Sequence, residues 1–212
     1  IGTRDSKLAL WQANKVKSLL EDLGVSSELV SVKSPADRDL STPLHQFGGT
    51  GIFTKVLDDA LLNNEVDIAV HSLKDYPTQA PKGLCIAAVL ERASATDILV
   101  HKDDLSFLEK ESGLIATGSI RRVAQWKSKY PKHETVGLRG NVQTRLQKLI
   151  NNPWNGAIFA KAGLERIDLL PAHYIELDWM IPAPAQGAIA IGCRESDLDL
   201  IQKLKEINHI ET

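Results

Sequence analysis

The sequence predicts an α/β fold of two lobes, each built on a mixed, mostly parallel sheet. Short apolar runs typical of buried strands alternate with amphipathic helical runs along most of the 212 residues. Residues 1–6 and 115–122 also resemble each other, because each is a strand end that leads into a helix start with a hydroxyl and an arginine. This internal echo indicates two similar lobes that face each other across a cleft.

The first part of the chain carries two predicted helices and three predicted strands. A helix is expected over 6–23, because Ser6 can cap it, apolar residues recur on one face and Gly24 follows as a stop. A second helix with the same one-sided pattern is expected over 52–62. The predicted strands are 29–33, 67–71 and 84–90.

The second part repeats this alternation. The predicted strands are 114–116, 135–138, 157–160 and 188–193. The predicted helices are 119–129, 142–150 and 198–207, with a further short helix that ends near Ile167. Strands that alternate with helices in this way favour largely parallel pairing.

Two stretches are predicted to cross between the lobes. We expect one lobe to contain 1–91 together with 187–212, and the other to contain 96–181. Residues 92–95 and 182–186 then form the hinge. Pro182 and Pro184 support this, because closely spaced prolines disfavour helix and suit a semi-rigid connection.

The composition excludes several classes of function. Apolar residues make up 43% and charged residues 25%, as in ordinary globular domains, and no run reaches the roughly 18 apolar residues of a membrane span. No charged start leads into an apolar run, so we expect no secretory signal. The net charge of -2 counts against nucleic acid as the main partner, because proteins that bind nucleic acids are usually basic. We expect a monomer that binds neither membranes nor nucleic acids.

Two cysteines, Cys85 and Cys193, lie inside apolar, strand-like runs. The favoured interpretation is a pair of buried, inert thiols, which fits a reducing cytoplasm. No histidine stands at metal-ligand spacing from a cysteine or carboxylate, so no metal site is expected.

The arginines are the most informative feature. Six of nine lie at or just after predicted strand ends, or on the first turns of the following helices: Arg4, Arg121, Arg122, Arg139, Arg145 and Arg166. Ligands bind at that edge in open α/β sheets, and guanidinium groups grip carboxylates bidentately. Any one of these arginines could be an ordinary solvated helix residue. Six at one kind of edge predict a site for a small, multiply anionic ligand.

A second candidate site follows the predicted strand 67–71. Lys74 and Asp75 could form a surface ion pair of little consequence, or a catalytic carboxylate with a cation beside it. The local residues leave both readings open. His71, at the end of the strand, is better explained as a structural hydrogen-bonding residue than as a base.

A glycine-rich stretch, 47–53, precedes the second predicted helix. It lacks the Gly-Lys-Ser/Thr ending of a nucleotide loop, and its glycine spacing does not fit a dinucleotide fingerprint. We therefore expect a loop or lid rather than a phosphate-binding loop.

Eight segments together resemble the porphobilinogen deaminase (hydroxymethylbilane synthase) family along nearly the whole chain. They are GTRDSKLALWQA (2–13), GGTGIFTKVLDDALL (48–62), DIAVHSLKDYPT (67–78), TGSIRRVAQ (117–125), LRGNVQTRLQKL (138–149), AKAGLERI (160–167), PAQGAIAIGCR (184–194) and INHIET (207–212). Each is modest evidence, but the eight occur in the family's order. The resemblance implies two lobes like those of type II periplasmic binding proteins, followed by a small third domain.

The resemblance also implies the activity and the roles of individual residues. The family condenses four porphobilinogens head to tail into hydroxymethylbilane, with release of ammonia, in tetrapyrrole and haem biosynthesis. Asp75 would be the catalytic carboxylate. The residues expected to bind the acetate and propionate arms of substrate and dipyrromethane cofactor are Arg4, Ser6, Lys74, Thr117, Ser119, Arg121, Arg122, Arg139, Arg145, Arg166 and Gln186.

Three features depart from the family pattern. Gly118 stands where the family usually has a second hydroxyl, and Ser34-Pro35-Ala36-Asp37 replaces a loop that usually contains a cation. The family's cofactor-attachment cysteine would lie beyond Thr212, and neither cysteine of this chain stands in that motif. We therefore expect residues 1–212 alone to bind porphobilinogen weakly and to polymerise it slowly or not at all.

One alternative function stays open at this point. A two-lobed, non-catalytic module for a small polycarboxylate would share the architecture, because fold alone does not give function. Asp75 distinguishes the two, since a carboxylate in the site of a mere binder repels an anionic ligand.

Overall fold

The computed structural model describes residues 1–33, 54–102, 105–110 and 112–212, which divide into two compact units. Unit 1 contains the described residues up to Ala93 together with Ala185–Thr212, and unit 2 contains those from Ser94 to Pro184. The Gly-rich stretch 47–53 and the departure at 34–37 lie outside the described residues.

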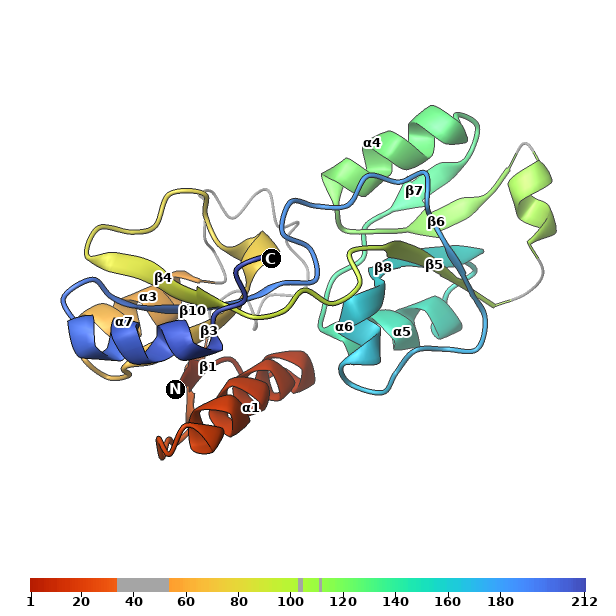
Figure 1. Cartoon of the computed structure of the whole chain (residues 1–212). Helices are drawn as coiled ribbons and strands as arrows, with labels where there is room; N and C mark the ends of the chain where they lie inside the picture. Colours follow the sequence, from red (N-terminus) through yellow and green to blue (C-terminus); the bar gives the residue numbers. More distant parts are fainter. Residues whose placement is uncertain (34–53, 103–104, 111) are drawn as a thin grey trace. The chain divides into compact units, whose positions relative to one another are not determined.

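Unit 1 is built on a five-stranded sheet in the order β2-β1-β3-β10-β4. The strands are β1 (Gly2–Thr3), β2 (Val30–Ser31), β3 (Ile68–Ser72), β4 (Leu84–Val89) and β10 (Ile189–Arg194). β1 is parallel to β2 and β3, whereas β10 is antiparallel to β3 and β4. The late strand β10 therefore lies inside the sheet, between β3 and β4 (Figure 1).

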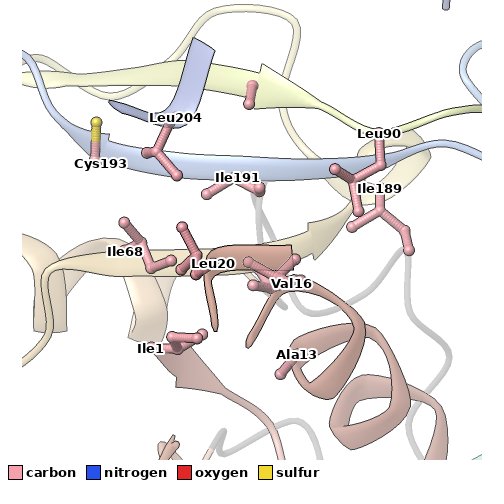
Figure 2. Close-up of a cluster of buried hydrophobic side chains, with 12 residues drawn as sticks. Ile1, Ala13, Val16, Leu20, Ile68, Leu90, Ile189, Ile191, Cys193 and Leu204 are labelled. Atoms are coloured by element: carbon pink, nitrogen blue, oxygen red, sulfur yellow. The ribbon is translucent and has the colours of Figure 1, made fainter. Parts of the chain in front are cut away.

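Helices cover both faces of this sheet. Along β3, Ile68 and Val70 point to one face and Ala69 to the other, as the two-residue period of a strand requires. α1 (Lys7–Asp22) and α7 (Leu198–Leu204) pack on the first face, and α3 (Lys55–Leu62) packs on the second. Figure 2 shows Val16 and Leu20 of α1 beneath Ile189 and Ile191 of β10.

Unit 2 repeats the plan with a five-stranded sheet in the order β7-β6-β8-β5-β9. The strands are β5 (Asp97–His101), β6 (Leu114–Ala116), β7 (Glu134–Val136), β8 (Gly156–Ala160) and β9 (Tyr174–Glu176). β6 is parallel to β7 and β8, and β5 is antiparallel to β8 and β9.

The helices of unit 2 also lie on two faces. α5 (Val142–Asn151) and α6 (Lys161–Glu165) share a core with Ile98 and Val100 of β5. α4 (Ile120–Lys129) places Trp126 on the other face with Leu99, beside the short 3-10 helix η3 (Ser106–Glu109). Figure 1 shows α4 and α5 on opposite sides of the strands within this unit.

The predicted α/β class and the mixed sheets are confirmed, and most predicted elements appear within a few residues of their expected bounds. Parallel pairs are four of the eight pairings among the described strands, rather than the expected majority. The reason is that one long strand in each unit, β10 or β5, runs against its neighbours. The strands β5 and β9 were not expected. In the described part of the chain, no helix is long and apolar enough to cross a membrane.

Candidate active site

The sheet of unit 1 gathers several of the expected site residues at one edge. β1 and β3 are parallel neighbours, with Gly2 opposite Ala69, so both end at this edge. β10 is antiparallel, with Ile189 opposite Ser72, so it begins there. The segments after β1, after β3 and before β10 therefore meet at the edge where ligands bind in open α/β sheets.

Arg4 and Ser6 occupy the segment between β1 and α1. The Ser6 side chain caps α1 by accepting a hydrogen bond from the backbone N–H of Ala9 at 3.2 Å. This cap fixes the start of the helix, whose exposed N–H groups and partial positive charge favour anions. Arg4 adds a full positive charge to the same segment.

Lys74 and Asp75 lie in the 3-10 turn η2 (Leu73–Asp75), directly after β3, and both are exposed. The Leu73 N–H donates to the carbonyl of Ala188 at 3.0 Å, which ties the turn to the segment before β10. Lys74 Nζ donates to Oε1 of the buried Gln186 at 3.4 Å. The structure therefore brings Lys74 and Gln186 into contact beside Asp75.

Below this edge, β3 carries two polar side chains. His71 is only 5% exposed, and burial, reinforced by the charge of Arg4, lowers its pKa to about 4. Its ring packs against Tyr76 with centroids 5.1 Å apart. His71 is therefore neutral at pH 7 and does not titrate near that pH. Ser72 accepts a hydrogen bond from Nε2 of Gln12 at 2.9 Å, which joins β3 to α1.

The sheet of unit 2 has an equivalent edge. β6, β7 and β8 are parallel and end there, and β5 begins there because Asp97 lies opposite Ala160. The Thr117 hydroxyl accepts from the Ser119 N–H at 3.3 Å. Ser119 in turn caps α4 by accepting from the Arg122 N–H at 3.5 Å.

Arg121 and Arg122 share one carboxylate. Arg122 Nη2 donates to Oδ1 of Asp97, and Arg121 Nη2 donates to Oδ2, each at 2.6 Å. Arg122 is only 7% exposed and also donates from Nη1 to the carbonyl of Ile158 at 2.9 Å. The Arg121 side chain is 25% exposed and also donates to the carbonyl of Ile181. Arg122 is thus embedded in the unit, whereas Arg121 reaches its surface.

Arg139 and Arg145 flank the turn from β7 into α5. Gly140 has a φ of +112°, and a Cβ there would lie 2.7 Å from the Thr144 side chain, so the turn requires glycine. Arg145 Nε donates to the Gly140 carbonyl at 2.6 Å, and Lys148 Nζ donates to the Arg139 carbonyl at 3.1 Å. This turn therefore carries three cationic side chains.

Arg166 is the C-cap of α6, half-buried, and burial lowers the pKa of its guanidinium from the ordinary value. It lies at the far end of the helix that follows β8.

The expected residues thus fall into two groups, one in each unit. Unit 1 brings together Arg4, Ser6, Lys74, Asp75 and Gln186, and unit 2 brings together Thr117, Ser119, Arg121, Arg122, Arg139 and Arg145. Sequence reasoning missed Asp97 and Gln12. The signal for Asp97 was an acidic residue at the head of the apolar run DILV, a position where a charge needs a partner.

The two cysteines lie opposite each other on β4 and β10, with sulfurs 3.9 Å apart and no disulfide between them. Burial and the neighbouring Cys85 raise the pKa of Cys193 to about 12. Cys193 therefore stays a protonated, weakly nucleophilic thiol at neutral pH. In the portion that the structure describes, no three His, Cys, Asp or Glu side chains are placed to hold a metal ion.

Solved structures of low sequence identity share this fold. An ancestral cationic amino acid solute-binding protein is 15% identical, covers 92% of this chain and 76% of its own, and superposes with a TM-score of 0.56. An arginine periplasmic binding protein from Legionella pneumophila is 14% identical over 93% of this chain and 80% of its own, with a TM-score of 0.51. These neighbours confirm the predicted type II periplasmic-binding-protein-like architecture.

Sequence relatives identify the family. Residues 1–202 match the family model described as porphobilinogen deaminase, dipyromethane cofactor binding domain. A probable porphobilinogen deaminase of Methanocaldococcus jannaschii is 48% identical over 100% of this chain and 73% of its own length. The porphobilinogen deaminase of Syntrophomonas wolfei is 43% identical over 99% and 70%. These matches favour the transferase over the non-catalytic binding module, and the chain therefore belongs to the porphobilinogen deaminase family of tetrapyrrole-synthesising transferases.

Proposed function

We propose that Asp75 is the catalytic carboxylate with which this family member condenses four porphobilinogens into hydroxymethylbilane. The observation that carries this proposal is the position of Asp75 in η2, next to Lys74 and at the sheet edge that also holds Arg4 and Gln186. A carboxylate held at this edge can act on the positive charge that the reaction creates.

Asp75 acts where ammonia leaves. Loss of the aminomethyl nitrogen of porphobilinogen leaves a cation delocalised over the pyrrole ring. A fixed carboxylate stabilises that cation electrostatically and accepts a hydrogen bond from the pyrrole N–H. The exposed position of Asp75 supports this role, because the side chain can reach a bound ring without rearrangement of β3.

The cationic and hydroxyl side chains bind the acetate and propionate arms of the pyrroles. In unit 1 we assign this role to Arg4, Ser6, Lys74 and Gln186, and in unit 2 to Thr117, Ser119, Arg121, Arg122, Arg139, Arg145 and Arg166. Each ring carries two carboxylates, so a growing chain of rings needs many such donors. The engagement of Arg122 with Asp97 and Ile158 leaves Arg121 as the more accessible member of that pair.

The donor set of unit 2 fits the dipyrromethane cofactor that the family model names. Guanidinium groups at two helix starts, α4 and α5, are suited to the four carboxylates of two linked pyrrole rings. When bound, this group supplies the primer to which substrate rings are joined. Arg121, Arg139 and Arg145 would hold its acidic arms.

Porphobilinogen is the small-molecule partner that the family implies. We further propose a monomeric, cytoplasmic enzyme with neither nucleic acid nor membrane as partner. The net charge of -2 supports the first exclusion, and the two unbonded cysteines are compatible with a reducing compartment.

The Asp75→Asn variant tests the assignment of the catalytic carboxylate. In the full-length gene product it should lower kcat by about 10²–10⁴-fold, the range for loss of one acid–base or charge-stabilising group. The melting temperature should stay within a few degrees of the parent, because Asp75 is exposed. Turnover is measured from hydroxymethylbilane formation with porphobilinogen as substrate.

The matched control is Asp22→Asn, which removes the same charge from an exposed residue at the end of α1. It should keep the parent's kcat and KM. An Asp75→Asn enzyme as active as this control would show that the carboxylate is not required.

A further inference from the structure

Asp97 is the one site-edge residue in the described part of unit 2 whose carboxylate holds two guanidinium groups. It is 0% exposed, and its two oxygens accept from Arg121 and Arg122 at 2.6 Å each. An isolated charge at this depth would be strongly disfavoured, whereas a hydrogen-bonded pair is tolerated. The carboxylate therefore depends on its arginines, and their orientation depends on it.

The backbone of Asp97 is fixed on both sides. As the first residue of β5 it lies opposite Ala160 of β8, and its carbonyl accepts from the Leu177 N–H at 2.9 Å. Arg122 is locked in turn by its second bond, to Ile158 in the same strand β8. Asp97 is consequently a rigid anchor inside the unit rather than a mobile surface charge.

Arg121 is the arginine partner of Asp97 that reaches solvent. One terminal nitrogen is bound to Asp97 and the other donates to the carbonyl of Ile181, while the side chain stays 25% exposed. A free arginine side chain samples many rotamers, and ordering them on ligand binding weakens affinity. The hydrogen bonds to Asp97 and Ile181 already hold the Arg121 side chain in one orientation before a ligand binds.

We propose that Asp97 is a positioning residue that fixes the guanidinium of Arg121 for the carboxylate arms of the pyrrole ligands. The inference rests on the proposed function, because it takes Arg121 as a ligand-binding group. It adds a residue to which neither the sequence motifs nor the family resemblance assign a role. Asp97 acts through Arg121 and does not touch the ligand itself.

Electrostatics alone predicts the opposite effect of removing Asp97. A buried carboxylate repels an anionic ligand, so its neutralisation should tighten binding if Asp97 contributed only its charge. If Asp97 positions Arg121, neutralisation should weaken binding, because the guanidinium loses its fixed orientation. The sign of the change in KM therefore separates the two explanations.

The experiment compares Arg122→Met with the double variant Asp97→Asn/Arg122→Met in the full-length gene product. The Arg122→Met background is needed because Asp97→Asn alone would leave the buried Arg122 uncompensated, which destabilises proteins. We expect the double variant to have a KM for porphobilinogen about tenfold above that of Arg122→Met, as for one weakened charge-assisted hydrogen bond. The kcat of cofactor-loaded enzyme should change much less.

The matched control is Asp178→Asn/Arg122→Met, because Asp178 is an exposed carboxylate of unit 2. It makes the same change in net charge and should have the KM of Arg122→Met. A second pair, Asp97→Glu and Asp178→Glu, keeps every charge and the native Arg122. There the KM should rise only for Asp97→Glu, which displaces the carboxylate by one methylene.

The outcomes separate this inference from the proposed function. If the parent enzyme does not turn over porphobilinogen, the proposed function fails. If the parent and Arg122→Met are active but the double variant has an equal or lower KM, the positioning role of Asp97 is wrong. Should Arg122→Met fail to fold, an unchanged KM in Asp97→Glu overturns the role in the same way.

Discussion

Arg121 and Arg122 are neighbours in the sequence, but their surroundings give them different tasks. Both donate to Asp97, yet Arg122 is buried and bound to β8, while Arg121 reaches solvent. Burial therefore decides which of two identical side chains can meet a ligand. Burial likewise decides the behaviour of His71, because it lowers the pKa of this side chain below the ordinary value for a histidine.

His71 should make the stability of the protein depend on pH. The pKa of His71 is about 4 in the folded chain and 6.5 when the side chain is exposed. Between these two pH values the unfolded chain therefore binds a proton that the folded chain does not bind. The free energy of unfolding is then highest above pH 6.5 and falls by up to about 3 kcal/mol as the pH drops to about 4. Urea midpoints at pH 7, 6, 5 and 4.5 measure this.

The His71→Asn variant serves as the reference, because it keeps a polar side chain of similar size but does not titrate. Carboxylates also titrate below pH 5, so the prediction concerns the difference between the two proteins. Curves of stability against pH that run parallel from pH 7 to 4.5 would contradict the assignment.

At this scale the sequence located most candidate residues but not their partners. Arg4, Lys74 and Arg121 stand at strand ends that hydrophobic patterns reveal. The pairing of Arg121 with Asp97 depends on β5 returning antiparallel beside β8, so residues 24 positions apart come together. No local pattern encodes that contact, and the burial that lowers the pKa of His71 depends likewise on packing from other elements.

Helices were easier to predict than strands because they are longer and carry their own end signals. α1 begins after the Ser6 cap, and Gly24 beyond its end has a φ of +74°, as a helix stop requires. β5 was missed because the charged Asp97 opens it, directly after the segment expected to be a hinge. β9 has only three residues and ends in Glu176, so it lacks the wholly apolar run that reveals the equally short β6.

The turn between β6 and α4 explains why this chain has Gly118. A Cβ at Gly118 would lie 2.6 Å from the carbonyl oxygen of Leu138, the residue before Arg139. That atom is backbone and cannot move aside cheaply, so the close approach of the two segments requires glycine. The missing hydroxyl is therefore a consequence of how these two segments pack.

We expect Gly118→Ser, which restores the family's usual hydroxyl, to destabilise the protein by about 1–3 kcal/mol, the usual cost of overpacking. Its melting temperature should fall by several degrees in a calorimetric scan. Gly137→Ser is the matched control, because a Cβ at Gly137 has no atom within 4 Å. If Gly118→Ser and Gly137→Ser have the same melting temperature, the contact with the Leu138 backbone does not exclude a side chain at position 118.

At the scale of the whole molecule, the chain is divided between two units with separate cores. Buried clusters in unit 1 draw on α1, α3 and β10, and those in unit 2 draw on α4, α5 and β8. The two units are divided after Ala93 and after Pro184. The hinge expected at 92–95 and 182–186 stays a prediction. Internal similarity was visible in the sequence because each unit repeats the strand–helix start.

Unit 2 is one continuous segment of the described chain from Ser94, and this predicts that residues 94–184 fold alone. The fragment keeps its five strands and both of its cores, so it should unfold cooperatively in urea with a native-like circular dichroism spectrum. Residues 1–93 alone should not unfold cooperatively, because they lack β10, the strand that pairs with both β3 and β4 and joins them in one sheet.

Joining 1–93 to 185–212 should restore the missing unit. The Ala93 N–H donates to the carbonyl of Gly187 at 3.1 Å, so the two ends to be joined already lie side by side and a short Gly/Ser linker can span them. The fused chain regains β10 and with it Ile189, Ile191 and Leu204 of the unit's core. Cooperative unfolding of the fusion, but not of 1–93, is the expected result. A fusion that stays unfolded while 94–184 folds would mean that unit 1 depends on unit 2 for its stability, and that only one of the two units is an independent domain.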